Sequence, residues 1–144
     1  MPRPPTLAAA MTPFPHSIGL DVTLRVAHDM MTEHAVRHLP VTNSRELVGV
    51  ISHSDVMAVW ARKTGHVALD ELTVKDVYIS DVYVVELDEP LENVLHTMAD
   101  RHIGSAIVTR HGRLSGVFTW VDACRCFGDY LAEYFPQPDG GDAA

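Results

Sequence analysis

The chain has 144 residues, of which 47% are hydrophobic, and a formal net charge of −8. This length fits a single domain of roughly 100–200 residues, and the apolar content is enough for a core. A phosphate backbone requires a basic face, so we expect no nucleic acid among the partners of so acidic a chain. Any anionic ligand must be held by local features, because the overall field repels it.

The sequence predicts a cytoplasmic protein without a membrane partner. Its apolar runs are only a few residues long, far shorter than a membrane span. Residues 1–5 are too short and too rich in proline for the apolar core of a signal peptide. The two cysteines, Cys124 and Cys126, lie two positions apart on a predicted helix and face different directions, so we expect no disulfide.

The first half of the chain predicts a short apolar segment, a helix, two strands and a second helix. The first helix follows Asp21, its expected N-cap, and has apolar side chains at every third or fourth position. These side chains are Leu24, Ala27, Met31 and Ala35. The other elements are the segment 16–18, strands at 38–42 and 47–52 around a turn at 43–45, and a helix from Ser52 to about Lys63.

The second half predicts the same order of elements. Its first helix follows Asp88, the expected N-cap, and Pro90, which is typical of helix starts. The positions that face one side of this helix are Leu91, Val94, Met98 and His102. The other elements are a strand at 82–85, strands at 105–109 and 114–119 around a turn at 110–112, and a helix at 119–134.

Residues 65–73 connect the two halves. Gly65 is expected to end a helix, and residues 70–72 are polar enough for a surface segment. The two ends of the chain, residues 1–6 and 135–144, are rich in Pro, Gly and Asp and have little to bury. We therefore expect both ends to be mobile.

The two halves are copies of one unit. Residues 49–55 read Gly-Val-Ile-Ser-His-Ser-Asp, and residues 116–122, which lie 67 positions later, read Gly-Val-Phe-Thr-Trp-Val-Asp. With the same shift and no gap, ten of the 42 positions from His16 to Met57 are identical to their counterparts. This period is too long for the common solenoids. The sequence therefore predicts an α+β fold in which two β-α-β-β-α units pack on each other as a pseudo-dimer.

Several motifs of this duplication resemble those of the CBS-domain family, named for the regulatory repeats of cystathionine β-synthase. Arg37-His38-Leu39-Pro40-Val41 precedes the first glycine motif, and Gly104-Ser105-Ala106-Ile107-Val108 precedes the second. Ala10-Met11-Thr12-Pro13 and Thr73-Val74-Lys75-Asp76-Val77 resemble the usual start of a repeat. The resemblance implies two repeats, at 7–68 and 69–134, related by a pseudo-twofold axis that leaves two clefts.

In this family the clefts often bind adenine nucleotides. The resemblance implies AMP, ADP or ATP as ligand, with S-adenosylmethionine or NAD as further possibilities, and frequent association of such modules into dimers. Homodimer contacts are expected on the helices that follow the two glycine motifs, which carry more apolar surface than one small pseudo-dimer can bury. The apolar positions are Val56, Val59, Trp60, Ala123, Phe127 and Leu131.

Two pairs of side chains, Ser52 with Asp55 and Thr119 with Asp122, are the candidate ligand clamps. Each follows a glycine-containing strand, after Val50 in one copy and Val117 in the other, so the following helix begins at the mouth of a cleft. Exposed N–H groups at a helix start favour anions. The resemblance implies that the hydroxyl binds phosphate and the carboxylate binds the ribose hydroxyls. A capping box, with a hydroxyl at N-cap and a carboxylate at N3, explains the same spacing, and the two roles are compatible.

The resemblance also implies that each cleft draws on both repeats. The Ser52/Asp55 clamp would face an adenine slot near Val77, Val82 and Ile103. The Thr119/Asp122 clamp would face Ala10, Pro15 and Val36.

Side chains in two further places distinguish the copies. Arg37 and His38 stand where family members direct basic side chains to phosphates, and their counterparts are Gly104 and Ser105. A solvated helix end explains Arg37 and His38 equally, and the sequence leaves open which cleft Arg37 serves. Trp120 could stack on a base or cover the core, and we favour the core.

No constellation of residues indicates catalysis or a metal site. His34 and His38 are four apart on a predicted helix, but no carboxylate completes an H-E-x-x-H pattern and the other histidines are scattered. The phosphate-loop and nucleophile-elbow motifs are absent from the sequence. We therefore expect a non-enzymatic module that senses an adenine nucleotide and signals to a regulated protein not identified by the sequence. The alternative is a structural dimerisation module with empty clefts.

Overall fold

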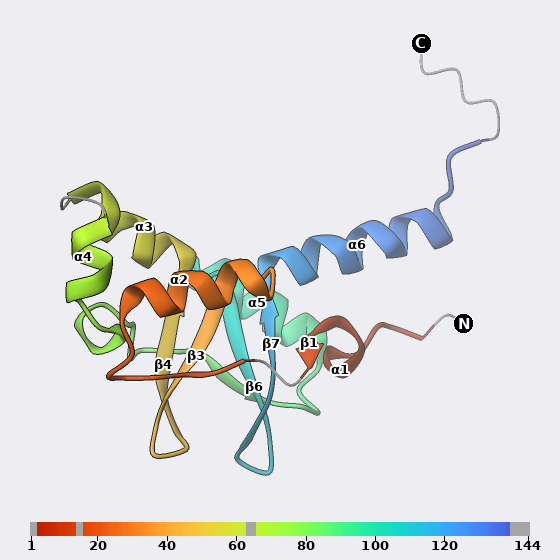
Figure 1. Cartoon of the computed structure of the whole chain (residues 1–144). Helices are drawn as coiled ribbons and strands as arrows, with labels where there is room; N and C mark the ends of the chain where they lie inside the picture. The colour runs from red at the N-terminus through yellow and green to blue at the C-terminus, as the bar shows by residue number, and fades with distance from the viewer. Residues whose placement is uncertain (1–2, 14–15, 63–65, 139–144) are drawn as a thin grey trace.

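The computed structural model describes residues 3–13, 16–62 and 66–138 of the chain (Figure 1). Its helices are α1 (Leu7–Ala10), α2 (Leu24–Glu33), α3 (His53–Arg62), α4 (His66–Glu71), the 3₁₀ helix η1 (Val74–Asp76), α5 (Leu91–Arg101) and α6 (Trp120–Tyr134). Its strands are β1 (Thr12–Pro13), β2 (Ile18–Gly19), β3 (His38–Asn43), β4 (Glu46–Ser52), β5 (Val84–Glu86), β6 (Ser105–Arg110) and β7 (Arg113–Thr119). The predicted order of strand, helix, two strands and helix is confirmed in both repeats.

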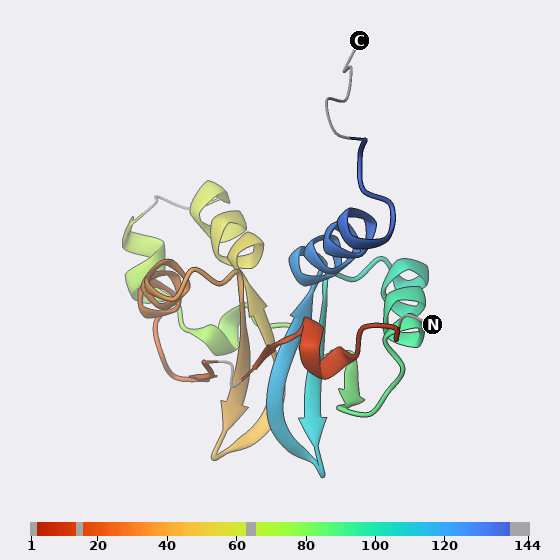
Figure 2. The ribbon, with the colours of Figure 1, turned by 90° about the vertical axis from the view of Figure 1, so that its right-hand side faces the viewer.

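The hydrogen-bonding register of the two repeats is the same. In the first sheet β2 is parallel to β3 and β3 is antiparallel to β4, with His38 opposite Ser52. In the second sheet β5 is parallel to β6 and β6 is antiparallel to β7, with Ser105 opposite Thr119. Figure 2 shows the two hairpins side by side, with α3 and α6 at the end away from the hairpin turns. The 67-residue shift found in the sequence is thus kept in the pairing of the strands.

The first segment of each repeat pairs with a strand of the other repeat. Thr12 in β1 lies opposite Val117 in β7. Ile79, 67 positions after Thr12, pairs with Val50 in β4 through N–H···O bonds of 2.9 Å in both directions. This reciprocal exchange joins the two repeats into the predicted pseudo-twofold pair.

The hydrophobic cores show the same exchange. Leu7 of α1 is buried with α5 and the second sheet, whereas Val74 of η1 is buried with α2 and the first sheet. The helix positions predicted to face the core do so, since the side chains of Leu24, Ala27, Met31, Leu91, Val94 and Met98 are all buried. Ala35 and His102 instead follow their helices, with left-handed φ angles of 54° and 53°.

The predicted N-caps of the first helices are wrong. α2 is capped by Thr23, whose side-chain oxygen accepts from the backbone N–H of Val26 at 3.4 Å. Asp21 lies two residues too early to reach this turn and instead pairs with Lys75 at 3.2 Å. α5 has Pro90 at its N-cap position, not Asp88.

The linker between the repeats is also different from the prediction. Residues 66–71 form α4, which packs against α2 and α3. Leu69 is fully buried in the first core, so α4 is part of that core and not the polar surface linker that was expected. Asp70, on the outer side, forms an ion pair with Arg25 of α2. Gly65, expected to end a helix, lies outside the described residues.

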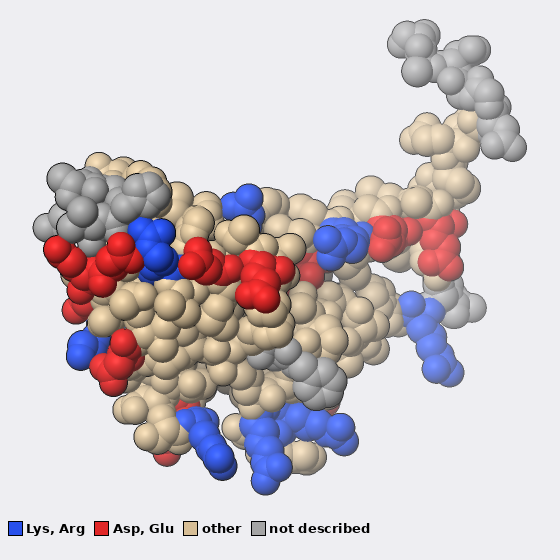
Figure 3. All heavy atoms as spheres, in the orientation of Figure 1, with Lys and Arg blue, Asp and Glu red and all other residues tan. Residues whose placement is uncertain are grey.

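Charge is distributed unevenly over the molecule. Figure 3 shows Lys and Arg side chains at the hairpin turns, where Arg45, Arg110 and Arg113 are exposed. Acidic side chains form a band over the helical part in the same view. Both hairpins turn through two residues of left-handed backbone, Ser44 and Arg45 in one, His111 and Gly112 in the other, as the twist of a tight hairpin requires.

Two observations concern the ends of the chain and the membrane. Thr6, in the N-terminal segment expected to be mobile, caps α1 by accepting from the backbone N–H of Ala9 at 3.2 Å. Residues 1–2 and 139–144 lie outside the described residues. Within residues 3–13, 16–62 and 66–138, none of the helices has the length and apolar character needed to cross a bilayer.

Candidate functional site

Both predicted clamps form capping boxes at the start of the helix after the hairpin. The N–H of Ser52 donates to Oδ2 of Asp55 at 2.8 Å, and the N–H of Asp55 donates to Oγ of Ser52 at 3.1 Å. In the second repeat, the N–H of Thr119 donates to Oδ2 of Asp122 at 2.9 Å, and the N–H of Asp122 donates back to Oγ1 of Thr119 at 3.5 Å. The capping interpretation is therefore correct for both pairs, and it uses one oxygen of each carboxylate.

The second clamp lies in a cleft between the two repeats, which we call the Thr119 cleft. Its volume of about 380 Å³ is within the range of about 300–1,000 Å³ typical of small-molecule sites. One wall comes from β1, His16, the end of α2 and the start of β3, and the other comes from β7 and α6. Its lining residues are Thr12, Pro13, His16, His34, Ala35, Val36, Arg37, His38, Val117, Thr119, Trp120, Val121, Asp122 and Arg125.

The backbone places Arg37 in this cleft. The Arg37 carbonyl accepts from the N–H of His53 at 2.8 Å, which fixes the chain just before β3 against the start of α3. The Gly104 carbonyl accepts from the N–H of Trp120 at 3.0 Å in the equivalent place. Arg37 is exposed and lines the Thr119 cleft, so the structure answers the question of its cleft that the sequence left open.

Asp122 is the buried charge of the Thr119 cleft. Only 5% of the residue is exposed. Its Oδ1 accepts a long hydrogen bond of 3.4 Å from the hydroxyl of Thr12 and lies 3.6 Å from a guanidinium nitrogen of Arg125. Asp55 differs, because its Oδ1 has no hydrogen-bond partner among the described residues. The two carboxylates therefore have different numbers of acceptor positions left for a ligand.

His38 lies between the two clamps. Its Nδ1 is buried and has no hydrogen-bond partner within the described part of the chain. Burial lowers the pKa of His38, and Arg37 lowers it further, while the carboxylates of Asp55 and Asp122 act in the opposite direction. His38 is therefore neutral at pH 7, and its ring can serve a ligand as a hydrogen-bonding group without carrying charge.

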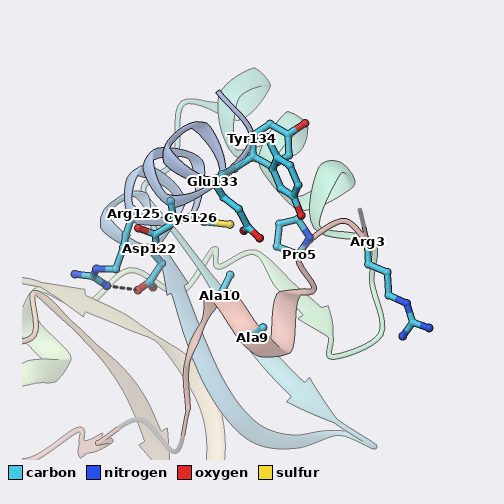
Figure 4. Close-up of a pocket in the computed structure, with 11 residues that line it drawn as sticks. Arg3, Pro5, Ala9, Ala10, Asp122, Arg125, Cys126, Glu133 and Tyr134 are labelled. Atoms are coloured by element: carbon cyan, nitrogen blue, oxygen red, sulfur yellow. Dashed lines mark ion pairs between the residues drawn. The ribbon is translucent and has the colours of Figure 1, made fainter. Parts of the chain in front are cut away.

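A second hollow lies on the other side of Asp122. This α1–α6 groove has a volume of about 270 Å³, and Figure 4 shows Pro5 next to Tyr134, Ala9 and Ala10 on α1 opposite α6, and the Arg3 side chain pointing away from Glu133. Ala10 lines this groove together with Asp122 of the second clamp, and it does not line the Thr119 cleft. Asp122 and Arg125 line both hollows, and Figure 4 marks the ion pair between them.

The residues expected around the first clamp are more dispersed. Val77 packs against the first hydrophobic core and Ile103 against the second. Val82 is half-buried after η1, and its N–H donates to the Ser80 carbonyl. Pro15, expected near the second clamp, lies outside the described residues.

Sequence reasoning did not anticipate several residues of the Thr119 cleft. His16 was among the histidines set aside as scattered, and His34 was considered only as a metal ligand, yet their rings stack in the cleft with a centroid distance of 3.5 Å. Arg125 could have been found, because it follows Asp122 by three positions on a predicted helix and such residues are neighbours. Trp120 is 54% exposed and lines the cleft, so the expectation of a core position is wrong.

His34 and His38, whose spacing was considered for a metal site, do not lie on one helix in the fold. His34 is the residue after α2, and His38 begins β3. In the described part of the chain, no three His, Cys, Asp or Glu side chains are grouped as metal ligands would be.

The sequence and the fold identify the family. A model of the CBS domain matches residues 7–62 and again residues 74–129. The chain belongs to the CBS-domain family and contains two CBS domains in tandem. An uncharacterized protein of Methanocaldococcus jannaschii, MJ1232, is 27% identical over 120 residues, which are 83% of this chain. The chain spans 38% of the length of that relative.

Solved structures share the architecture. A candidate acetoin utilization protein (AcuB) from Vibrio cholerae superposes with a TM-score of 0.77 at 24% identity, covering 94% of this chain and 100% of that one. The CBS domain pair of protein MJ0100, in complex with 5′-methylthioadenosine and S-adenosyl-L-methionine, superposes with a TM-score of 0.78 at 22% identity, covering 89% of this chain and 99% of that one. At these identities the likeness concerns the fold.

Proposed function

We propose that this protein is a non-enzymatic regulatory module that binds an adenine nucleotide of the AMP, ADP or ATP class in the Thr119 cleft. The observation that carries the proposal is the meeting of three kinds of group in one cleft. These are the N-terminus of α6 with its hydroxyl and carboxylate, Arg37 from the other repeat, and apolar surface for a flat base from Pro13, Val36 and Val117. A phosphate at the helix start is favoured by the helix dipole.

The two clefts of the pseudo-twofold pair are not equivalent for such a ligand. The 67-residue shift carries Arg37 onto Gly104 and carries Ala58 onto Arg125. The Thr119 cleft therefore has two guanidinium groups where the cleft of the first clamp has none at these positions. Guanidinium groups are preferred ligands of phosphate, so the Thr119 cleft is proposed as the tighter nucleotide site.

The likeness to the MJ0100 pair supports an adenosine-containing ligand, because that protein was solved with 5′-methylthioadenosine and S-adenosylmethionine. The charge of the cleft distinguishes among adenosine-containing ligands. S-adenosylmethionine carries a sulfonium cation, whereas the Thr119 cleft carries Arg37 and Arg125 against the single carboxylate of Asp122. This balance favours the anionic nucleotides over S-adenosylmethionine.

The proposed mechanism of signalling follows from the place of the cleft. A ligand that contacts both repeats can bind one arrangement of the repeats more tightly than another. It then stabilises the arrangement that it binds more tightly. A regulated partner protein, or a second copy of the chain, would respond to that change. The existence of such a partner and a cytoplasmic location remain predictions from the sequence.

Replacement of Arg37 by Ala tests the proposed contact with phosphate. We expect ATP and ADP to bind up to about tenfold more weakly to the variant, and adenosine to bind nearly unchanged, because only a phosphate contact is lost. Isothermal titration of the three ligands measures this difference, and nucleotide released from heat-denatured purified protein provides an independent check. An equal loss for adenosine and ATP would assign Arg37 to the support of the fold.

A dimerisation module is the second candidate function, and the outer face of α6 favours it. Four apolar side chains on this helix and its C-cap remain exposed, Trp120 by 54%, Phe127 by 61%, Leu131 by 40% and Phe135 by 65%. The contacts expected from α3 have less support, because Val56 is fully buried and Val59 and Trp60, both half-buried, pack against the first core. Ala123 of α6 likewise packs against the second core. We propose a homodimer through α6 alone.

Sedimentation measures this association. The wild-type chain is expected to sediment as a dimer of the 15.9 kDa polypeptide at tens of micromolar concentration. The variant with Phe127→Ser and Leu131→Ser is expected to be a monomer. Val26→Ser, which changes a residue of similar exposure, 45%, on α2, serves as the control. A monomeric wild type would remove the dimer from the proposal.

A further inference from the structure

One contact recurs in both repeats with different chemistry. The rings of His16 and His34 are nearly parallel, with an interplanar angle of 14° and a centroid distance of 3.5 Å. The 67-residue shift carries these residues onto Tyr83 and Arg101. The structure pairs those residues as well, with the guanidinium carbon of Arg101 at 5.4 Å from the centre of the Tyr83 ring. A cation over a ring in the second repeat thus corresponds to two imidazoles in the first.

The histidine pair lies where a cation would act on a ligand. Both rings line the Thr119 cleft, His16 from the segment before β2 and His34 from the C-cap of α2. The C-terminal end of a helix favours a positive charge, and a ring face stabilises a neighbouring cation. A cationic His34 would therefore occupy the position that the permanent cation of Arg101 has in the second repeat.

Two cationic rings in face-to-face contact would repel each other, so one added proton on the pair is favoured over two. The other charged or titratable groups of the cleft are Arg37 and His38 from the start of β3, and Asp122 and Arg125 from α6. Burial keeps His38 neutral, and Arg125 partly neutralises Asp122. The side chains around the pair therefore sum to a positive charge in the empty cleft, which a bound phosphate would offset.

We propose that His16 and His34 form a phosphate subsite of the Thr119 cleft that takes up a proton when a nucleotide phosphate binds. This inference rests on the proposed function and assigns to it two residues and a dependence on pH. The second repeat has the permanent cation Arg101 over the Tyr83 ring at the equivalent position, so we expect no such dependence there.

The experiment compares AMP and adenosine between pH 6 and pH 8. An opposite charge favours the protonated imidazole, which titrates in this range, so we expect wild-type affinity for AMP to be about three- to tenfold higher at pH 6 than at pH 8. Adenosine affinity should be constant. Titration of AMP at pH 7 in two buffers of different ionisation enthalpy should show net uptake of a proton by the wild-type protein.

The matched variant replaces the pair by the residues of the second repeat, as His16→Tyr with His34→Arg. It should bind AMP at pH 8 about as tightly as the wild type does at pH 6, with little change between the two values. Because AMP itself titrates near pH 6, the difference between wild type and variant isolates the contribution of the histidines.

The outcomes separate this inference from the proposed function. AMP binding with the same pH dependence in both proteins, or without proton uptake by the wild type, would overturn the histidine subsite and leave the nucleotide site in place. If neither AMP nor adenosine binds at any pH, both proposals are wrong.

Discussion

Replacement of Gly49 by Ala is expected to reduce the free energy of unfolding by about 1–3 kcal/mol, the range for overpacking a filled interior. A Cβ at this position would overlap the backbone carbonyl oxygen of Ile79, the residue that pairs with Val50, and would also lie 2.6 Å from the Tyr78 ring. A backbone oxygen held in a strand pair cannot move away without breaking that pair. The loss therefore measures the contact between the repeats, and not the conformational freedom of glycine.

Two other glycines supply the comparison. At Gly116, a Cβ would lie 2.7 Å from the Thr12 carbonyl oxygen and 2.5 Å from the flexible Met11 side chain, so Gly116→Ala should destabilise as well, but less. Gly128 is exposed in the middle of α6, and nothing lies within 4 Å of a Cβ there. Gly128→Ala should stabilise the protein by about 0.5–1 kcal/mol, since glycine is unfavourable inside a helix.

Urea denaturation of the three variants measures these differences directly. For a domain of this size, 1 kcal/mol corresponds to a change of about 3–5 °C in Tm. If Gly49→Ala were as stable as the wild type, the exchange of segments between the repeats would not be the reason for the glycine in both motifs.

Loss of the carboxylate of Asp122 should weaken nucleotide binding by about ten- to a hundredfold. A charge-assisted hydrogen bond is worth about 1.5–3 kcal/mol, and a ribose hydroxyl would lose such an acceptor in Asp122→Ala. At a ligand concentration 100 times the wild-type Kd, the bound nucleotide stabilises the wild type by about 2.7 kcal/mol. The same concentration would stabilise the variant by only about 0.4–1.4 kcal/mol.

The capping role of Asp122 predicts a loss that does not need ligand. An N-terminal cap contributes about 1 kcal/mol, and Asp122 also accepts from Thr12 and pairs with Arg125, so the ligand-free variant should be destabilised by somewhat more than that. Asp55→Ala should cost about 1 kcal/mol, because its contacts are confined to the cap.

Asp76 provides a capping box without a place in the Thr119 cleft. The N–H of Thr73 donates to Oδ2 of Asp76 at 2.9 Å, and this bond lowers the pKa of that carboxyl. Asp76→Ala should therefore destabilise the ligand-free protein while the stabilisation by nucleotide is retained. A thermal-shift titration of all three variants separates the roles. Asp122 acts only as a cap if its variant retains the full nucleotide stabilisation, as the Asp76 variant is expected to do.

The sequence by itself determined the duplication, the order of elements and the buried faces of the main helices. These features are local or periodic. Leu24, Ala27 and Met31 lie on one side of a helix whatever it packs against, and alternation with turn residues defines each hairpin. The clamps could be found in the same way, since Thr119 and Asp122 are three positions apart at a helix start, where their spacing fixes the capping geometry.

Only the tertiary structure decided how the two copies meet. The burial of Leu69 depends on α4 packing across α2 and α3, and no local pattern distinguishes that from a polar linker. The meeting of Arg37 with Thr119, and the stacking of His16 on His34, join residues from separate elements around the pseudo-twofold axis. A repeat in sequence establishes that two units are alike, but the side chains that face each other across their interface follow from the exchange of β1 and its counterpart between the sheets.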